Sequence, residues 1–159
     1  MTAQQVRTAL SDRQALALTV FGEARRETLR GQHAVAWVVR NRTLYPQRFG
    51  TGWKSVCLRP AQFSCWYPWG GAANYAAVIA AAERLLDGHA PAPTSALGRA
   101  VQVATDVMAG LGADPTGGAD HYYAPAAMVP AGRVPIWATG HTPTAVIGAH
   151  RFYRLVMTV

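Results

Sequence analysis

The sequence has few charged side chains, few cysteines and no long apolar run. Only 14% of its 159 residues are charged, eight are acidic and two are cysteine. No stretch approaches the roughly 18 apolar residues that a membrane span needs; residues 76–82, for example, are followed by Glu83 and Arg84. Disorder is excluded as well, because half of the residues are hydrophobic. We therefore expect one globular domain, since a chain of this length can bury a core without disulfides or metals.

Several catalytic signatures are also missing. The chain has no G-x-S-x-G of Ser/His/Asp hydrolases and no glycine-rich phosphate loop, and its histidines His121, His141 and His150 match no short metal motif. We expect no cofactor and no metal. Cys57 and Cys65 lie eight residues apart, so a disulfide is geometrically possible and two free thiols are the alternative. A Cys/His protease stays open, although nothing around either cysteine indicates an activated thiol.

Positive charge is in excess, with a formal net charge of +7. Such a protein is attracted to nucleic acid, anionic lipid or an acidic cell envelope. The basic residues form no run and accompany no nucleic-acid motif, which favours an anionic envelope over specific nucleic-acid binding. The first ten residues lack the features of a signal peptide, so we expect synthesis in the cytoplasm without a leader.

Helical patterns dominate the first two thirds of the chain. We expect helices over residues 12–22, 29–44, 75–87 and 94–110. Ser11-Asp12-Arg13-Gln14 is a capping box for the first, and Asn74 can cap the third. Residues 1–10 are interpreted as a polar lead-in, residues 47–71 as a long irregular loop, and residues 121–123 and 145–159 as extended segments. The predicted fold class is α+β, a mostly helical single domain over residues 11–159 with a small β element.

One acidic residue follows an apolar run. Residues 16–21 lead through Gly22 into Glu23, which precedes Arg25 and Arg26. If the run is a buried helix, it brings Glu23 to the edge of the core, where a poorly solvated carboxyl can hold a proton and act as a general acid. The alternative is a solvated helix-end glutamate paired with Arg25 or Arg26.

Aromatic and polar side chains gather outside the predicted helices, in residues 62–66, 119–123 and 147–153 and at Trp53, Trp69 and Trp137. Aromatic faces flanked by hydrogen-bonding groups suit sugar rings. The alternative is that these rings form a satellite core under long loops. The candidate substrate-binding residues are Gln62, Ser64, Trp66, His121, Tyr122, Tyr123, Trp137 and His150.

Several segments, taken in order, resemble the cell-wall hydrolases typified by the spore-cortex-lytic germination enzymes (SleB-like), which also occur as phage lysins. The segments are 22–25 (GEAR), 31–36 (GQHAVA) with 38–42 (VVRNR), 60–66 (PAQFSCW), 114–123 (DPTGGADHYY) and 147–153 (IGAHRFY). The resemblance covers roughly residues 14–154. Two positions depart from the family pattern, since Arg26 replaces a usual glycine and Asp120 stands where threonine is commoner. Neither departure removes a group that the mechanism needs.

The resemblance implies a lysozyme-like (lytic transglycosylase-like) fold and cleavage of peptidoglycan between N-acetylmuramic acid and N-acetylglucosamine. It implies that Glu23 is catalytic. The family is generally regarded as lytic transglycosylases, in which one glutamate protonates the bridging oxygen and then takes the proton from the muramic acid C6 hydroxyl, closing a 1,6-anhydro ring. With no leader and no wall-binding domain, we expect a monomeric phage endolysin that reaches the wall after another protein permeabilises the membrane.

Two other hypotheses remain open. A hydrolytic muramidase needs two carboxylates about 5 to 9 Å apart, and Glu27 or Asp120 would supply the second. Our interpretation puts Glu27 in the loop before the helix at 29–44, where it meets the positive helix N-terminus, so a one-glutamate mechanism fits better. The other hypothesis is a non-catalytic basic module that binds anionic wall polymers or nucleic acid.

Overall fold

A computed structural model describes residues 1–156 as a mostly helical α+β fold, which confirms the predicted class. The helices are α1 (Ala3–Ala9), α2 (Asp12–Ala24), α3 (Leu29–Thr43), α4 (Pro46–Phe49), α5 (Trp53–Leu58), α6 (Ala72–Leu86) and α7 (Ala96–Met108). Short 3-10 helices are η1 (Ser64–Trp66), η2 (Pro68–Gly70), η3 (Pro125–Ala127) and η4 (Ile136–Ala138). The strands are β1 (His121–Tyr123), β2 (Ala145–Ile147) and β3 (His150–Tyr153). Over residues 1–156, no helix combines the length and apolarity that crossing a membrane requires.

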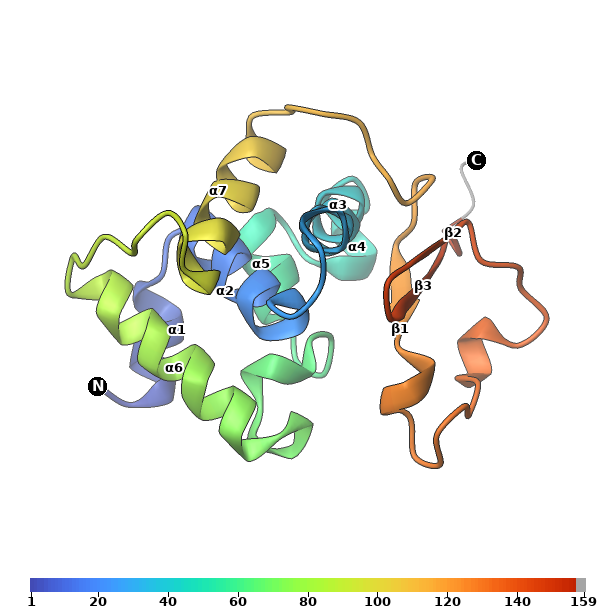
Figure 1. Ribbon diagram of the computed structural model, residues 1–159, viewed down its shortest axis with the longest axis horizontal. Coiled ribbons are helices and arrows are strands. Elements are labelled where there is room, and N and C mark those ends of the chain that lie inside the picture. Colours follow the sequence, from blue (N-terminus) through green and yellow to red (C-terminus); the bar gives the residue numbers. More distant parts are fainter. Residues whose placement is uncertain (157–159) are drawn as a thin grey trace.

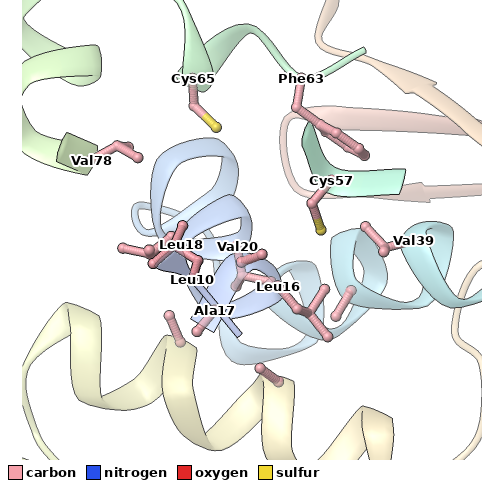
Figure 2. Packing of buried hydrophobic residues seen from close by; sticks show 14 of the residues in the cluster. Leu10, Leu16, Ala17, Leu18, Val20, Val39, Cys57, Phe63, Cys65 and Val78 are labelled. Atoms are coloured by element: carbon pink, nitrogen blue, oxygen red, sulfur yellow. The ribbon is translucent and has the colours of Figure 1, made fainter. Parts of the chain in front are cut away.

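Helix α2 is the axis of the helical part, and α3, α5, α6 and α7 all pack against it (Figure 1). Its N-terminus carries the predicted capping box, in which Ser11 and Gln14 satisfy each other's backbone N–H groups. Residues 15–20 are all buried, because a helix that is apolar on every side needs neighbours on every side. Figure 2 shows Leu16, Leu18 and Val20 of α2 surrounded by side chains from these neighbours. The apolar run before Glu23 is therefore a buried helix, as the sequence predicts.

Residues 1–10 differ from the expected polar lead-in, because they contain helix α1. Thr2 and Gln5 form a second capping box, and the side chains of Val6 and Leu10 are buried in the main core. Helix α1 packs against α6. The apolar face of this short helix consists of few residues. The polar residues around them therefore hide the helical pattern in the sequence.

The expectation of an irregular loop over residues 47–71 is also wrong, because this stretch contains most of α4 and all of α5, η1 and η2. These elements are three to six residues long, too short to show a hydrophobic period. Helix α6 begins at Ala72 with Gly71 as its N-cap, so Asn74 lies inside the first turn and is free for another role.

The three strands form one antiparallel sheet in the order β1-β3-β2. Tyr122 pairs with Phe152. Of the predicted extended stretch over 145–159, residues 145–153 form the hairpin β2–β3, which turns at residues 148–149, and residues 157–159 lie outside the described part of the chain. The sheet packs on α3 through Ala34 and Val38. In Figure 1 the sheet lies on the opposite side of the molecule from α1 and α6.

Candidate active site

Glu23 lies in the last turn of α2, and its carboxyl group is held from two sides. Oε1 accepts a hydrogen bond from the backbone N–H of Cys65 at 3.0 Å, with the Ser64 hydroxyl 3.5 Å away. Oε2 accepts a hydrogen bond from the hydroxyl of Tyr122 at 2.8 Å. Three elements that are distant in sequence, α2, η1 and β1, thus converge on one half-buried carboxyl group.

The alternative of a solvated Glu23 paired with a neighbouring arginine does not match this geometry. Arg25 instead donates to the carbonyl of Phe21 and to the side chain of Asn74, and its guanidinium lies over the Phe21 ring. Within residues 1–156, neither Arg25 nor Arg26 forms an ion pair with Glu23.

Gly22 allows the close approach of η1 to α2. A β-carbon at this position would lie 2.5 Å from Cβ and 2.7 Å from Sγ of Cys65, and 2.8 Å from a methyl group of Val78. The amide of Asn74 also donates to the carbonyl of Gly22 at 3.0 Å, which ties the first turn of α6 to the same point. The glycine before Glu23 therefore has a packing role, because it lets the Cys65 N–H reach the carboxyl group.

Tyr122 is positioned by the sheet and by the aromatic rings around it. Its ring lies against those of Phe63, His150 and Phe152, with centroids 4.9 to 6.5 Å apart. Burial raises the pKa of the Tyr122 phenol well above its ordinary value, and the nearby Glu23 carboxylate raises it further. The hydroxyl therefore stays protonated and remains a donor to Glu23 at neutral pH.

Two adjoining hollows meet at Glu23 and together form a groove. They share Gly22, Glu23, Asn74, Ala124, Ala127 and His150. We call the first, of about 740 Å³, the charged arm, because Arg25, Arg26 and Glu27 also line it. We call the second, of about 380 Å³, the aromatic arm; Arg42, Gln62, Ser64, Trp69, Tyr122 and Tyr123 are among its lining residues. A separate hollow of about 600 Å³, beside Asp12, Lys54 and Arg59, contains none of the predicted site residues.

Glu27 lies in the loop between α2 and α3, as predicted, and its side chain lies beside Gly31 in the first turn of α3. Thr28 caps that helix by accepting from the Gly31 N–H, whereas the Glu27 carboxylate turns to the β2–β3 hairpin. There, Oε1 lies 3.8 Å from Nδ1 of His150, and Oε2 is 3.5 Å from the Ala149 N–H. Burial lowers the pKa of His150 despite the two nearby carboxylates, so this contact is not an ion pair at neutral pH.

Five of the predicted substrate-binding residues line the aromatic arm: Gln62, Ser64, Tyr122, Tyr123 and His150. Arg42, which the sequence interpretation did not single out, connects two of the segments that form the aromatic arm. Its Nε donates to the Asp120 carbonyl at 2.7 Å, its Nη1 donates to the Gln62 side chain at 3.2 Å, and its guanidinium lies over the rings of Phe49 and Phe63. Burial lowers the pKa of the Arg42 guanidinium from its ordinary value. The sequence signal for this role was its place among the valines of α3, an arginine on an otherwise apolar helix face.

The other three predicted substrate-binding residues lie outside the groove. Trp66 is only 1% exposed, and its indole N–H donates to Thr19 within the main core at 3.0 Å. The rings of His121 and Trp137 pack against each other, and Trp137 also contacts Tyr123 and Tyr153. Trp66 is thus a core residue, whereas His121 and Trp137 are partly exposed rings of an aromatic cluster outside the groove, in keeping with the satellite-core alternative.

Asp120, the other proposed second carboxylate, is buried away from both arms of the groove. Burial alone would raise its pKa, but hydrogen bonds from His121 and from the backbone N–H groups of Leu155 and Val156 outweigh that effect and leave it lowered. Its oxygens are thus used to hold β1 to the segment after β3.

The two cysteines are free and buried, which overturns the disulfide alternative. Burial raises the pKa of Cys57 to about 12 and that of Cys65 well above its ordinary value. Neither thiol is poised as a nucleophile, so the geometry gives no support to a Cys/His protease. Within residues 1–156, no cluster of three or more His, Cys, Asp or Glu side chains could hold a metal ion.

A family model described as Cell Wall Hydrolase matches residues 26–153, most of the chain. The chain belongs to the cell wall hydrolase family. The resemblance noted in the sequence is thereby confirmed, and membership supports a peptidoglycan-degrading enzyme. The match contains most of the residues that line the two arms, but it begins three residues after Glu23. No curated protein and no solved structure was found to match this cell wall hydrolase.

Proposed function

We propose that this cell wall hydrolase cleaves the bond between N-acetylmuramic acid and N-acetylglucosamine as a lysozyme-like lytic transglycosylase, with Glu23 as both acid and base. The observation that carries the proposal is the position of the Glu23 carboxyl at the junction of the two arms, with one hydrogen bond to each oxygen. A glycan strand lying along the groove would pass directly over this group.

In the first step, the protonated Glu23 carboxyl donates its proton to the bridging oxygen while the bond from C1 of the muramoyl residue to that oxygen breaks. The positive charge that develops at C1 is then quenched by the C6 hydroxyl of the same sugar. Glu23, now a carboxylate, takes the proton of that hydroxyl as the new C1–O6 bond closes the anhydro ring. The proton count balances without water, and one carboxyl group suffices.

Tyr122 and Cys65 suit both states of this carboxyl group. The Cys65 N–H can only donate, so it orients Oε1 as an acceptor. A phenolic hydroxyl both donates and accepts, so Tyr122 can donate to the carboxylate and accept from the protonated acid. Residues 64–65 and Tyr122 therefore hold the group in place while its proton leaves and returns.

A hydrolytic muramidase is the second candidate, because Glu27 lines the same groove as Glu23. In that mechanism Glu27 would activate water or stabilise the cation. Its contacts with the Ala149 N–H and the neutral His150 leave it available as a base. Asp120 does not serve this candidate, since its oxygens are buried and hydrogen-bonded.

Product analysis on purified sacculi tests these candidates. We expect wild type to release 1,6-anhydro muropeptides in mass spectra, Glu23→Gln to release none, and Glu27→Gln to release anhydro products at a reduced rate or unchanged. Reducing-end products, each heavier by one water, together with loss of activity in Glu27→Gln, would replace the transglycosylase with the muramidase.

The hypothesis of a non-catalytic basic module has its own test. Glu23→Gln should lose lysis while still sedimenting with cell walls. A wild-type protein that binds walls but releases no fragment would support the module and refute the enzyme.

We further propose the biological setting of a phage endolysin that reaches the wall after the membrane is permeabilised. The net charge of +7 would draw it to the anionic envelope. Because salt screens such attraction, we expect wall sedimentation to weaken as the salt concentration rises from 0.05 to about 0.5 M.

A further inference from the structure

Trp69, in η2, is an exposed aromatic residue that lines the groove. Its side chain is 67% exposed, which is unusual for so large an apolar group, yet it lines the aromatic arm together with Glu23. Trp66, three residues earlier, is enclosed in the core. An exposed indole that the fold leaves in a groove is available to a ligand.

The indole is held in a fixed orientation by a stack of side chains. The ring of Trp69 lies nearly parallel to that of Tyr67, with centroids 5.2 Å apart and an angle of 11° between the planes. The guanidinium of Arg7 lies 5.4 Å from the centroid of the Tyr67 ring, and Arg7 also donates to the carbonyl of Trp66. The stack connects α1 to the groove through Tyr67. The Trp69 side chain therefore has little rotamer freedom left to lose when a ligand binds.

The backbone of η2 adds to this rigidity. A β-carbon at Gly70 would collide with the carbonyl oxygen of Ser64, so the absence of a side chain lets η2 pack tightly on η1. Backbone hydrogen bonds from Gly70 to Tyr67 and from Gly71 to Pro68 close its turns. Trp69 is therefore fixed beside Ser64, whose neighbour Cys65 holds Glu23.

The groups next to Trp69 match the edges of a sugar ring. Gln62 accepts from Arg42 through its carbonyl oxygen, which directs its amide N–H groups outward as donors. Ser64 supplies a hydroxyl in the same arm, and Asn74, whose amide already binds the Gly22 carbonyl and Arg25, has one further N–H. An aromatic face with amides and a hydroxyl at its rim fits a pyranose with apolar C–H faces and polar N-acetyl and hydroxyl substituents.

We propose that Trp69 is the stacking platform of an N-acetylhexosamine subsite in the aromatic arm, next to the bond cleaved at Glu23. The inference rests on the proposed function, since it assumes that a glycan strand occupies the groove. The subsite binds one sugar ring in both the ground state and the transition state. Its main effect is therefore on substrate affinity rather than on the chemical step.

The test compares Trp69→Ala and Trp69→Leu with Trp69→Phe, which keeps an aromatic face. Ile136→Ala is the matched control, because Ile136 is 88% exposed and lies outside the groove. The probe is a chitin oligosaccharide titrated by calorimetry, followed by turnover of solubilised peptidoglycan strands.

We expect the Ala and Leu variants to bind the oligosaccharide about tenfold more weakly, from the worth of one aromatic stacking contact. Their KM for glycan strands should rise with kcat nearly unchanged, the pattern of lost uniform binding. Trp69→Phe should retain most of the affinity, and Ile136→Ala all of it. Because Trp69 is exposed, its replacement should leave the melting temperature close to that of wild type.

Wild-type affinity and KM in both Trp69→Ala and Trp69→Leu would overturn the platform, as would a fall in kcat alone. Either result would leave the proposed function standing as long as Glu23→Gln abolishes product release. Conversely, product release by Glu23→Gln would refute the proposed function whatever the Trp69 variants do.

Discussion

Removing the Tyr122 hydroxyl is the most direct probe of the proposed chemistry. In Tyr122→Phe, the ring and its contacts with Phe63, His150 and Phe152 persist, so the perturbation is confined to the 2.8 Å hydrogen bond to Glu23. A hydrogen bond to a charged group contributes about 1.5–3 kcal/mol. If that contribution is made when Glu23 is a carboxylate in the transition state, kcat should fall by roughly 10- to 150-fold.

The assay is the initial rate of anhydro-muropeptide release from sacculi, with melting temperature measured in parallel. Tyr153→Phe is the matched control, because Tyr153 is a buried tyrosine of the same sheet whose ring packs on Tyr123 and Trp137, outside the groove lining. It should keep the wild-type rate. The raised pKa of Tyr122 adds a second expectation: the rate of wild type should show no step from phenol ionisation up to pH 10.

A Tyr122→Phe enzyme that is as stable and as fast as wild type would refute the reasoning, because it would mean that the hydroxyl does not act on the reacting carboxyl group. Equal losses in Tyr122→Phe and Tyr153→Phe would also count against it, since they would reflect a general disturbance of the sheet.

Three further predictions concern stability and thiol reactivity. Gly22→Ala should lower stability by about 1–3 kcal/mol, because the new methyl group overlaps Cys65. It should also lower the lytic activity per folded molecule, and thermal melts and lysis rates measure the two effects. Since burial lowers the pKa of His150 below 6.5, the unfolded chain binds more protons than the folded chain just below that pH. The stability of wild type should therefore fall as the pH drops from 6.5 to 5. In thermal melts across that range, the stability of His150→Gln should fall less steeply. Cys57 and Cys65 should not react with a thiol reagent at pH 8 until the protein is denatured, and labelling of the native protein would contradict their burial and raised pKa values.

Local signals in the sequence predicted the helical part well. The capping box at Ser11 is present, and the run before Glu23 is buried because it is apolar on every face. These features depend on neighbours within a few residues, so the sequence contains what is needed to predict them. The loop position of Glu27 follows from the same signals, since it lies between a helix end and a helix cap.

The environment of each candidate side chain was harder to predict, because it depends on contacts between distant segments. Trp66 and Trp69 occupy the same segment and have similar sequence neighbours. Trp66 is buried and donates to the Thr19 hydroxyl, 47 positions earlier, whereas Trp69 is exposed in the groove. Arg42 reaches the Asp120 carbonyl 78 positions later. Asn74 looked like a helix cap but binds the carbonyl before Glu23.

The Asp120 carboxylate holds the two chain segments at one end of the sheet together. It lies immediately before β1 and accepts the backbone N–H groups of Leu155 and Val156, beyond the last rung of β3. The strand that carries Tyr122 is thereby secured by residues that never approach the groove. Trimming the chain back to Tyr153 would leave a buried negative charge with fewer donors, and the loosening would reach the reacting carboxyl through Tyr122, only two positions away.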